Sequence, residues 1–169
     1  FEIRGTAITS LVWDFQLLPT NDFGWLDELS ISNLALKNNK SSFDAKFNLP
    51  TLQKLYCSEN KLSSIDVTQA HDLFLIDCAD NNIQELDITK CHSLKTLRCN
   101  NNKIKTLNIE NLNSLEELNV SYNEGLTDLN FARRPNIKNL SCAGLNLKTV
   151  ELEGMSNLNY LDCSLNNIT

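Results

Sequence analysis

Apolar residues recur along the chain at a spacing of 21 residues. The shared pattern is L-x-x-L-x-C-x-x-N-x-L-x-x-L-D-I, and the fourth unit has one extra residue within Glu124-Gly125. The six units begin at Leu52, Leu73, Leu94, Leu115, Ile137 and Leu158. Positions one, four and six of each unit are predicted to point inward, because positions four and six alternate with polar positions as in a short strand.

Each unit alone carries too little apolar surface to stay folded, so we expect the units to stack as parallel strands about 4.8 Å apart. An asparagine occupies position nine in Asn60, Asn81, Asn102, Asn123 and Asn166. Its amide is predicted to hydrogen-bond backbone groups of neighbouring turns and to form a ladder. The fifth unit has Leu145 at this position and Asn146 one residue later, so we expect a local distortion between Glu124 and Asn146.

A second apolar cluster occurs later in each unit, at positions fourteen to sixteen. It comprises Ile65-Asp66-Val67, Leu86-Asp87-Ile88, Leu107-Asn108-Ile109, Leu129-Asn130-Phe131 and Val150-Glu151-Leu152. These clusters are too short and too rich in β-branched residues for a stable helix. The pattern predicts extended or 3-10 segments on the convex return side, and little α-helix.

Over residues 52–169 the pattern resembles the leucine-rich-repeat signature, L-x-x-L-x-L-x-x-N/C-x-L, with cysteine at the third core position. The resemblance implies a solenoid of the α/β horseshoe class, rich in β-structure, with a parallel sheet on its concave face. The unit length, the cysteine and the L-D-I/V-T segment are similar to 21-residue repeats of proteins secreted or surface-displayed by Bacteroides-like bacteria. Internalin-type repeats are a more distant resemblance, since their units usually have 22 residues. The implied protein is an exported bacterial one that binds a partner, and no specific binding residue is transferred.

Three segments are predicted. Residues 1–25 form an N-terminal cap, residues 26–51 form an irregular first repeat, and residues 52–169 form six repeats of which the last is truncated. The chain stops at Thr169, position twelve of a unit. We therefore expect that the parent chain continues, or that this end packs on another molecule.

Five of the six cysteines share position six, because Cys57, Cys78, Cys99, Cys142 and Cys163 follow one another at 21, 21, 43 and 21 residues. Thiols at an inward position act as small apolar groups, and in-register parallel neighbours have poor geometry for a disulfide. We therefore expect reduced, buried cysteines, with Cys91 in the convex core. His71 and His92 share position twenty on adjacent convex turns and are expected to be surface residues. No metal site or cofactor is predicted.

The net charge of the chain and the motifs that it lacks disfavour several classes of function. The net charge of −6, without a cluster of Lys and Arg, disfavours nucleic-acid binding. No run of 18 apolar residues occurs, so no membrane insertion is expected. The chain lacks a G-x-S-x-G motif and a glycine-rich phosphate loop, and both histidines are predicted on the convex side. An enzyme is therefore not expected.

The concave sheet offers candidate binding residues at its outward positions three and five, which vary in chemistry from unit to unit. Tyrosine and arginine are frequent anchors of protein contacts, although Asp77 and Arg98 can also form an ion pair between neighbouring strands. The candidates are Lys54, Tyr56, Asp77, Arg98, Glu117, Asn119, Tyr160 and Asp162.

These observations favour a non-enzymatic module that recognises a protein or peptide through the concave sheet. By resemblance it is extracellular or at the cell surface, while a cytoplasmic location stays open. One alternative is a structural spacer or adhesin stalk with no specific concave ligand. A further alternative is the targeting part of a longer enzyme.

Overall fold

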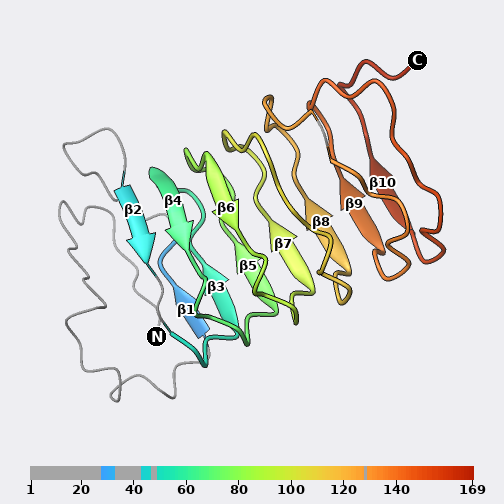
Figure 1. The fold of residues 1–169 in the computed structure, drawn as a ribbon. Coiled ribbons are helices and arrows are strands. Elements are labelled where there is room, and N and C mark those ends of the chain that lie inside the picture. The colour runs from blue at the N-terminus through green and yellow to red at the C-terminus, as the bar shows by residue number, and fades with distance from the viewer. Residues whose placement is uncertain (1–27, 33–42, 47–48, 128) are drawn as a thin grey trace.

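The chain winds as a parallel β-solenoid, in which each repeat forms one coil (Figure 1). The structure is a computed structural model that describes residues 28–32, 43–46, 49–127 and 129–169. The predicted cap of residues 1–25 lies outside the described residues. One sheet has seven parallel strands, which are β1 (Glu28–Ser30), β3 (Lys54–Tyr56), β5 (Leu75–Asp77), β7 (Thr96–Arg98), β8 (Glu117–Asn119), β9 (Asn139–Ser141) and β10 (Tyr160–Asp162), side by side in that order.

A second sheet runs along part of the return side. It contains β2 (Phe43–Lys46), β4 (Leu62–Asp66) and β6 (Glu85–Asp87), which are also parallel. The described residues contain no helix, and so none that could cross a membrane. The sequence-based prediction of a β-rich leucine-rich-repeat solenoid with extended return segments and little α-helix is therefore confirmed.

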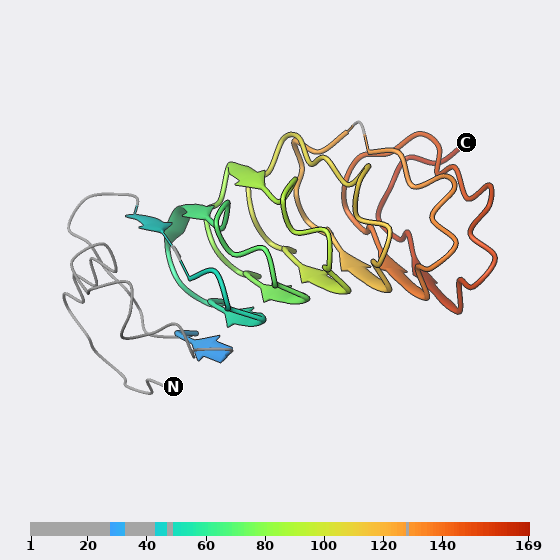
Figure 2. The ribbon, with the colours of Figure 1, turned by 60° about the horizontal axis from the view of Figure 1, so that its bottom comes forward.

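Because the strands pair in register, residues at one position of successive units lie directly beside one another. We call such a set of residues a column. Leu55 pairs with Ile76 and Ile76 with Leu97, and Leu118, Leu140 and Leu161 continue this position-four column. All of these are buried except Leu161, in the last unit. Figure 2 shows the coils stacked along one axis, with the seven strands on one side. The core is therefore continuous from coil to coil, as the apolar pattern predicts.

The cysteines lie where the period places them. Cys57, Cys78, Cys99 and Cys142 are buried, Cys163 is half-buried, and Val120 occupies the same position in the fourth unit. Cys91 is buried on the return side, and all six thiols are free. Burial raises the pKa of the Cys99 and Cys142 thiols to about 12 and that of Cys91 to about 11. The pKa values of Cys57 and Cys78 are also raised by burial.

Alkylation of the native protein with iodoacetamide is expected to modify Cys163 first. The thiolate is the nucleophile, and burial both blocks access to the other thiols and disfavours their ionisation. Peptide mass spectrometry after labelling at pH 8 should show Cys99 reacting at least about a hundredfold more slowly than Cys163. Denatured protein, as the control, should label at all six positions. Equal rates in the native state would contradict a packed column.

The position-nine asparagines form the predicted ladder. The Nδ2 amide of Asn102 donates to the carbonyl oxygens of Cys78, Cys99 and Asn100, at 3.0 to 3.2 Å. Its Oδ1 accepts the Ile83 N–H at 2.9 Å. Asn81 and Asn123 repeat this arrangement one coil earlier and one coil later. Each buried amide therefore links the backbones of two adjacent coils by hydrogen bonds.

The fifth unit departs from the ladder, as predicted. Leu145 is fully buried in place of an asparagine, so the Leu126 N–H of the preceding coil lacks the side-chain acceptor used elsewhere. That N–H instead donates to the Asn123 carbonyl at 2.8 Å, across the turn that contains the extra residue. Asn166 in the last unit accepts from both Leu145 and Leu147, each at 3.0 Å. The insertion and the missing asparagine therefore compensate each other.

A second irregularity of the fourth unit is Arg134. It occupies the return-side column that elsewhere holds Ala70, Cys91, Leu112 and Met155. One guanidinium nitrogen donates to the Glu110 carbonyl at 2.8 Å, but the Nε is buried without a hydrogen-bond partner in the described structure. An unsatisfied buried donor costs about 1 to 3 kcal/mol.

Replacing Arg134 with methionine is expected to raise the free energy of unfolding by about 1 kcal/mol, because it removes that donor and extends an apolar column. Urea unfolding followed by circular dichroism measures the change. The exposed neighbour supplies a matched control, and Arg133→Met should leave the stability within about 0.5 kcal/mol. A destabilised Arg134→Met protein would show that the Glu110 contact outweighs the buried Nε.

Candidate functional site

The candidate site is the outward face of the seven-stranded sheet, called here the strand face and formed by positions three, five and seven of each unit. All eight residues predicted from the sequence lie on it. Lys54 and Tyr56 are on β3, Asp77 is on β5 and Arg98 is on β7. Glu117 and Asn119 are on β8, and Tyr160 and Asp162 are on β10. Most of these side chains are half-buried by their neighbours, while Tyr160 is 54% exposed.

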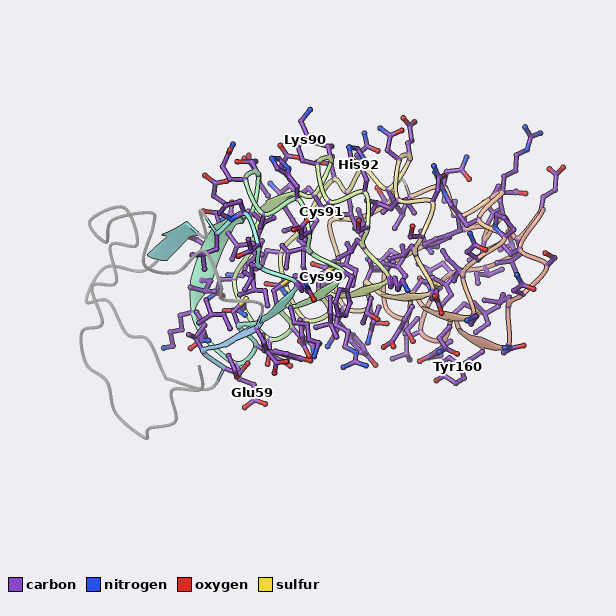
Figure 3. The ribbon with its side chains drawn as sticks, turned by 90° about the horizontal axis from the view of Figure 1, so that it is seen from below. Glu59, Lys90, Cys91, His92, Cys99 and Tyr160 are labelled. Atoms are coloured by element: carbon purple, nitrogen blue, oxygen red, sulfur yellow. The ribbon has the colours of Figure 1, made fainter. Side chains whose placement is uncertain are left out.

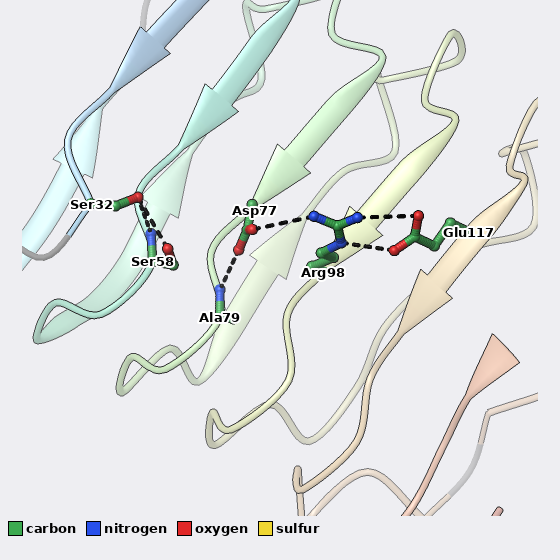
Figure 4. A network of polar contacts seen from close by, with 6 residues as sticks. All are labelled: Ser32, Ser58, Asp77, Ala79, Arg98 and Glu117. Atoms are coloured by element: carbon green, nitrogen blue, oxygen red, sulfur yellow. Dashed lines mark hydrogen bonds and ion pairs between the residues drawn. The ribbon is translucent and has the colours of Figure 1, made fainter. Parts of the chain in front are cut away.

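A charged cluster occupies the middle of the strand face. The Arg98 guanidinium donates to both carboxylate oxygens of Glu117, with Nε–Oε1 at 2.7 Å and Nη2–Oε2 at 3.3 Å (Figure 4). Asp77 on the other neighbouring strand is farther away, at 3.8 Å. The hydrogen bond to Glu117 raises the pKa of Arg98. The sequence pairs Arg98 with Asp77, but the structure shows that Glu117 is its closer partner.

A second ion pair joins the first two strands. The Lys54 Nζ lies 2.9 Å from Glu28 Oε2 on β1, and 6.0 Å from the centre of the Phe74 ring. Glu28 is not among the residues predicted from the sequence, because the first repeat departs from the 21-residue spacing. The contacts with Glu28 and Phe74 hold the Lys54 side chain against the sheet. Like the Arg98 cluster, this pair is partly exposed, so its contribution to stability is small.

Position five also shapes the turn that follows each strand. The Oδ1 atoms of Asp77 and Asn119 accept the N–H two residues later, at 3.3 and 3.2 Å. Asp162 accepts both the N–H and the hydroxyl of Ser164, at 3.1 and 2.7 Å. These two bonds lower the pKa of Asp162. Acidic and amide residues at position five therefore have a local structural role as well as a place on the strand face.

A row of turn residues, which the sequence pattern did not predict, lies beside the strand face. Position eight of every unit has a left-handed backbone, and we call this row the turn edge. It consists of Glu59, Asp80, Asn101, Tyr122, Gly144 and Leu165. Asn101 and Gly144 were the available signal, because both residue types favour positive φ.

His92 lies on the opposite side of the solenoid from the strand face. His92 and Lys90 project from the return side, whereas Tyr160 of the strand face and Glu59 of the turn edge project the other way (Figure 3). Among the residues that the structure describes, no group of three or more His, Cys, Asp or Glu side chains could hold a metal ion. On the strand face and the turn edge, aromatic, charged and amide side chains adjoin one another.

Comparisons with known proteins support the fold. The chain is similar to a solved structure described as the functional domain of InlJ from Listeria monocytogenes, including a cysteine ladder. The identity is 26% and the TM-score 0.69, over 85% of this chain and 34% of that protein, so the chain spans about a third of its length. The comparison supports a leucine-rich-repeat solenoid similar in fold to InlJ, and such a fold is compatible with protein binding. No protein-family profile and no curated protein sequence matches the chain.

Proposed function

We propose that this chain is a non-enzymatic recognition module that binds a protein or peptide through its strand face. The observation that carries the proposal is the in-register stacking of seven strands. Because of this stacking, Tyr56, Arg98 and Tyr160 lie on one ordered surface, while the inward columns form the core. Repeat solenoids use such extended surfaces to bind partners, and tyrosine and arginine are, with tryptophan, enriched among the side chains that anchor protein contacts.

The proposal extends to the setting of the protein. The similarity to InlJ supports the internalin-type part of the resemblance, and we propose an exported bacterial protein that acts outside the cell or at its surface. The more specific likeness to repeat proteins of Bacteroides-like bacteria stays a prediction from unit length and cysteine position. The role of any longer protein that contains this chain is likewise a proposal.

A structural spacer is the second candidate, and one observation favours it. Lys54 and Arg98 are already paired with Glu28 and Glu117 within the sheet, so both cations have partners without any ligand. In a spacer these pairs only keep the surface hydrated. In a recognition module they also fix the orientation of the side chains that a ligand meets.

Selection from a displayed random-peptide library separates the two candidates. Peptides selected on the wild-type chain should bind at least about tenfold more weakly to a variant that combines Tyr56→Ala, Arg98→Ala and Tyr160→Ala. The matched control alters three exposed return-side residues, with Glu85→Ala, Lys90→Ala and His92→Ala, and should bind normally. Peptides that bind the strand-face variant unchanged would refute the proposal and leave the spacer.

A further inference from the structure

The turn edge has an unusual backbone. Position eight has φ between 54° and 65° in all six units, although glycine occurs there only at Gly144. The left-handed region is unfavourable for residues with a Cβ atom, less so for asparagine and aspartate and more so for bulky side chains. The coil geometry thus imposes this conformation whether or not the residue type at position eight favours it.

The residue types at position eight differ between the first three and the last three units. The first three units have the polar residues Glu59, Asp80 and Asn101, and the Asn101 amide donates to Asp80 at 2.8 Å. The last three units have Tyr122, Gly144 and Leu165, of which Tyr122 is 47% and Leu165 71% exposed. Two bulky apolar side chains therefore occupy strained and exposed positions, where they gain little burial.

Gly144 joins these two side chains into one patch. A Cβ atom at Gly144 would lie 2.9 Å from Cδ1 and 3.1 Å from Cε1 of the Tyr122 ring, so the ring covers the glycine. The next coil, on the far side of Gly144, carries Leu165. The glycine therefore provides the space in which the Tyr122 ring extends toward Leu165.

Charge around this patch is predominantly negative. On the strand face of β8 to β10, positions three and five contain the carboxylates of Glu117 and Asp162 and no lysine or arginine. On the earlier strands of this face, Glu28 and Asp77 accompany the cations of Lys54 and Arg98. Both cations are engaged by carboxylates of neighbouring strands. Asp162, on the strand that leads into Leu165, has no cationic partner among the described residues. This surface therefore attracts a cationic ligand.

We propose that the turn edge at Tyr122, Gly144 and Leu165, with the adjoining strand face of β8 to β10, binds a basic peptide segment that carries one apolar anchor side chain. The anchor packs on Tyr122 and Leu165, while lysine or arginine side chains of the ligand meet Asp162 and the exposed Tyr160 ring. This inference rests on the proposed function, and it specifies which part of the surface binds and what class of peptide it selects.

Three synthetic probes test it by fluorescence anisotropy. The first alternates lysine and serine around one central tryptophan over about nine residues, enough to span three coils. The second has glutamate for lysine, and the third has serine for tryptophan. The first probe should bind at least about tenfold more tightly than either of the others, and its binding should weaken as salt is raised.

The variants Tyr122→Asn and Leu165→Asn locate the site. Asn101 occupies the same position in the third unit, so asparagine suits the backbone there, and the melting temperature of Leu165→Asn should rise by about 2 °C. The double variant should bind the lysine–tryptophan probe at least about tenfold more weakly. Leu152→Ser removes an exposed apolar side chain from the return side and should bind normally.

Three results would overturn the inference: no measurable binding of the lysine–tryptophan probe, equal binding of the glutamate probe, or unchanged binding by the double asparagine variant. Failure here is distinguishable from failure of the proposed function. Library-selected peptides that depend on Tyr56, Arg98 and Tyr160 but not on Tyr122 and Leu165 would retain strand-face recognition and refute only the basic, anchored ligand.

Discussion

Replacing Asn102 with alanine is expected to lower the free energy of unfolding by about 3 to 5 kcal/mol. The side chain is 8% exposed and lies in the middle of the array. Its loss leaves the Ile83 N–H without its side-chain acceptor. It also removes one hydrogen bond from each of three carbonyl oxygens, of which those of Cys78 and Cys99 keep the amides of Asn81 and Asn123. The unsatisfied buried N–H costs about 1 to 3 kcal/mol and each lost hydrogen bond about 0.5 to 1.5 kcal/mol, and partial entry of water keeps the total below the sum. Denaturant unfolding measures the change.

Two companion variants sharpen this prediction. Asn113→Ala alters an exposed asparagine of the same unit and should change the stability by less than about 0.5 kcal/mol. Asn102→Asp retains an acceptor for Ile83 but places a carboxylate against three carbonyl oxygens, so it should destabilise at least as much as alanine. A loss below about 1 kcal/mol for Asn102→Ala would mean that the ladder is not a principal support of the stack.

The cysteine column supplies the second large effect. Cys99→Ser is expected to lower the free energy of unfolding by about 2 to 3 kcal/mol, because a hydroxyl replaces a fully buried thiol. Cys99→Val should cost less than about 1 kcal/mol, since Val120 fills the same position one coil later. Thermal and urea unfolding of both variants, with and without reductant, give the comparison.

This pair of variants distinguishes packing from thiol chemistry. If position six needs only a small apolar group, valine substitutes for cysteine and serine does not. A Cys99→Val protein that is as unstable as Cys99→Ser would show that the sulfur itself is required. The raised pKa of Cys99 fits the packing interpretation, because burial keeps the thiol protonated.

The sequence predicted most of the fold because its evidence is periodic. A leucine or asparagine at one position is weak evidence, whereas its recurrence every 21 residues identifies a buried column and the repeat length together. The same reasoning placed the histidines away from the strand face and located the defect at Leu145. The compensation by the inserted residue was not predictable, because it depends on the Leu126 N–H finding the Asn123 carbonyl.

The candidate site was less predictable. Periodicity identifies which side chains face outward, and the eight predicted residues do share one face. It does not specify how long side chains pair across strands, so Glu117 was not recognised as the closer partner of Arg98. Nor does it show backbone torsions, which is why the turn edge with Tyr122 and Leu165 was missed. Surface function depends on these individual departures from the repeat.

Nuclear magnetic resonance titration with a library-selected peptide tests the central claim of strand-face recognition most directly. Backbone amide shifts should change along the strand face, on β3, β5 and β7 to β10 and the turns that follow them, while the return-side strands β4 and β6 stay unchanged. Changes centred on β4, β6 and the turn at His92, with the strand face unaffected, would contradict the account.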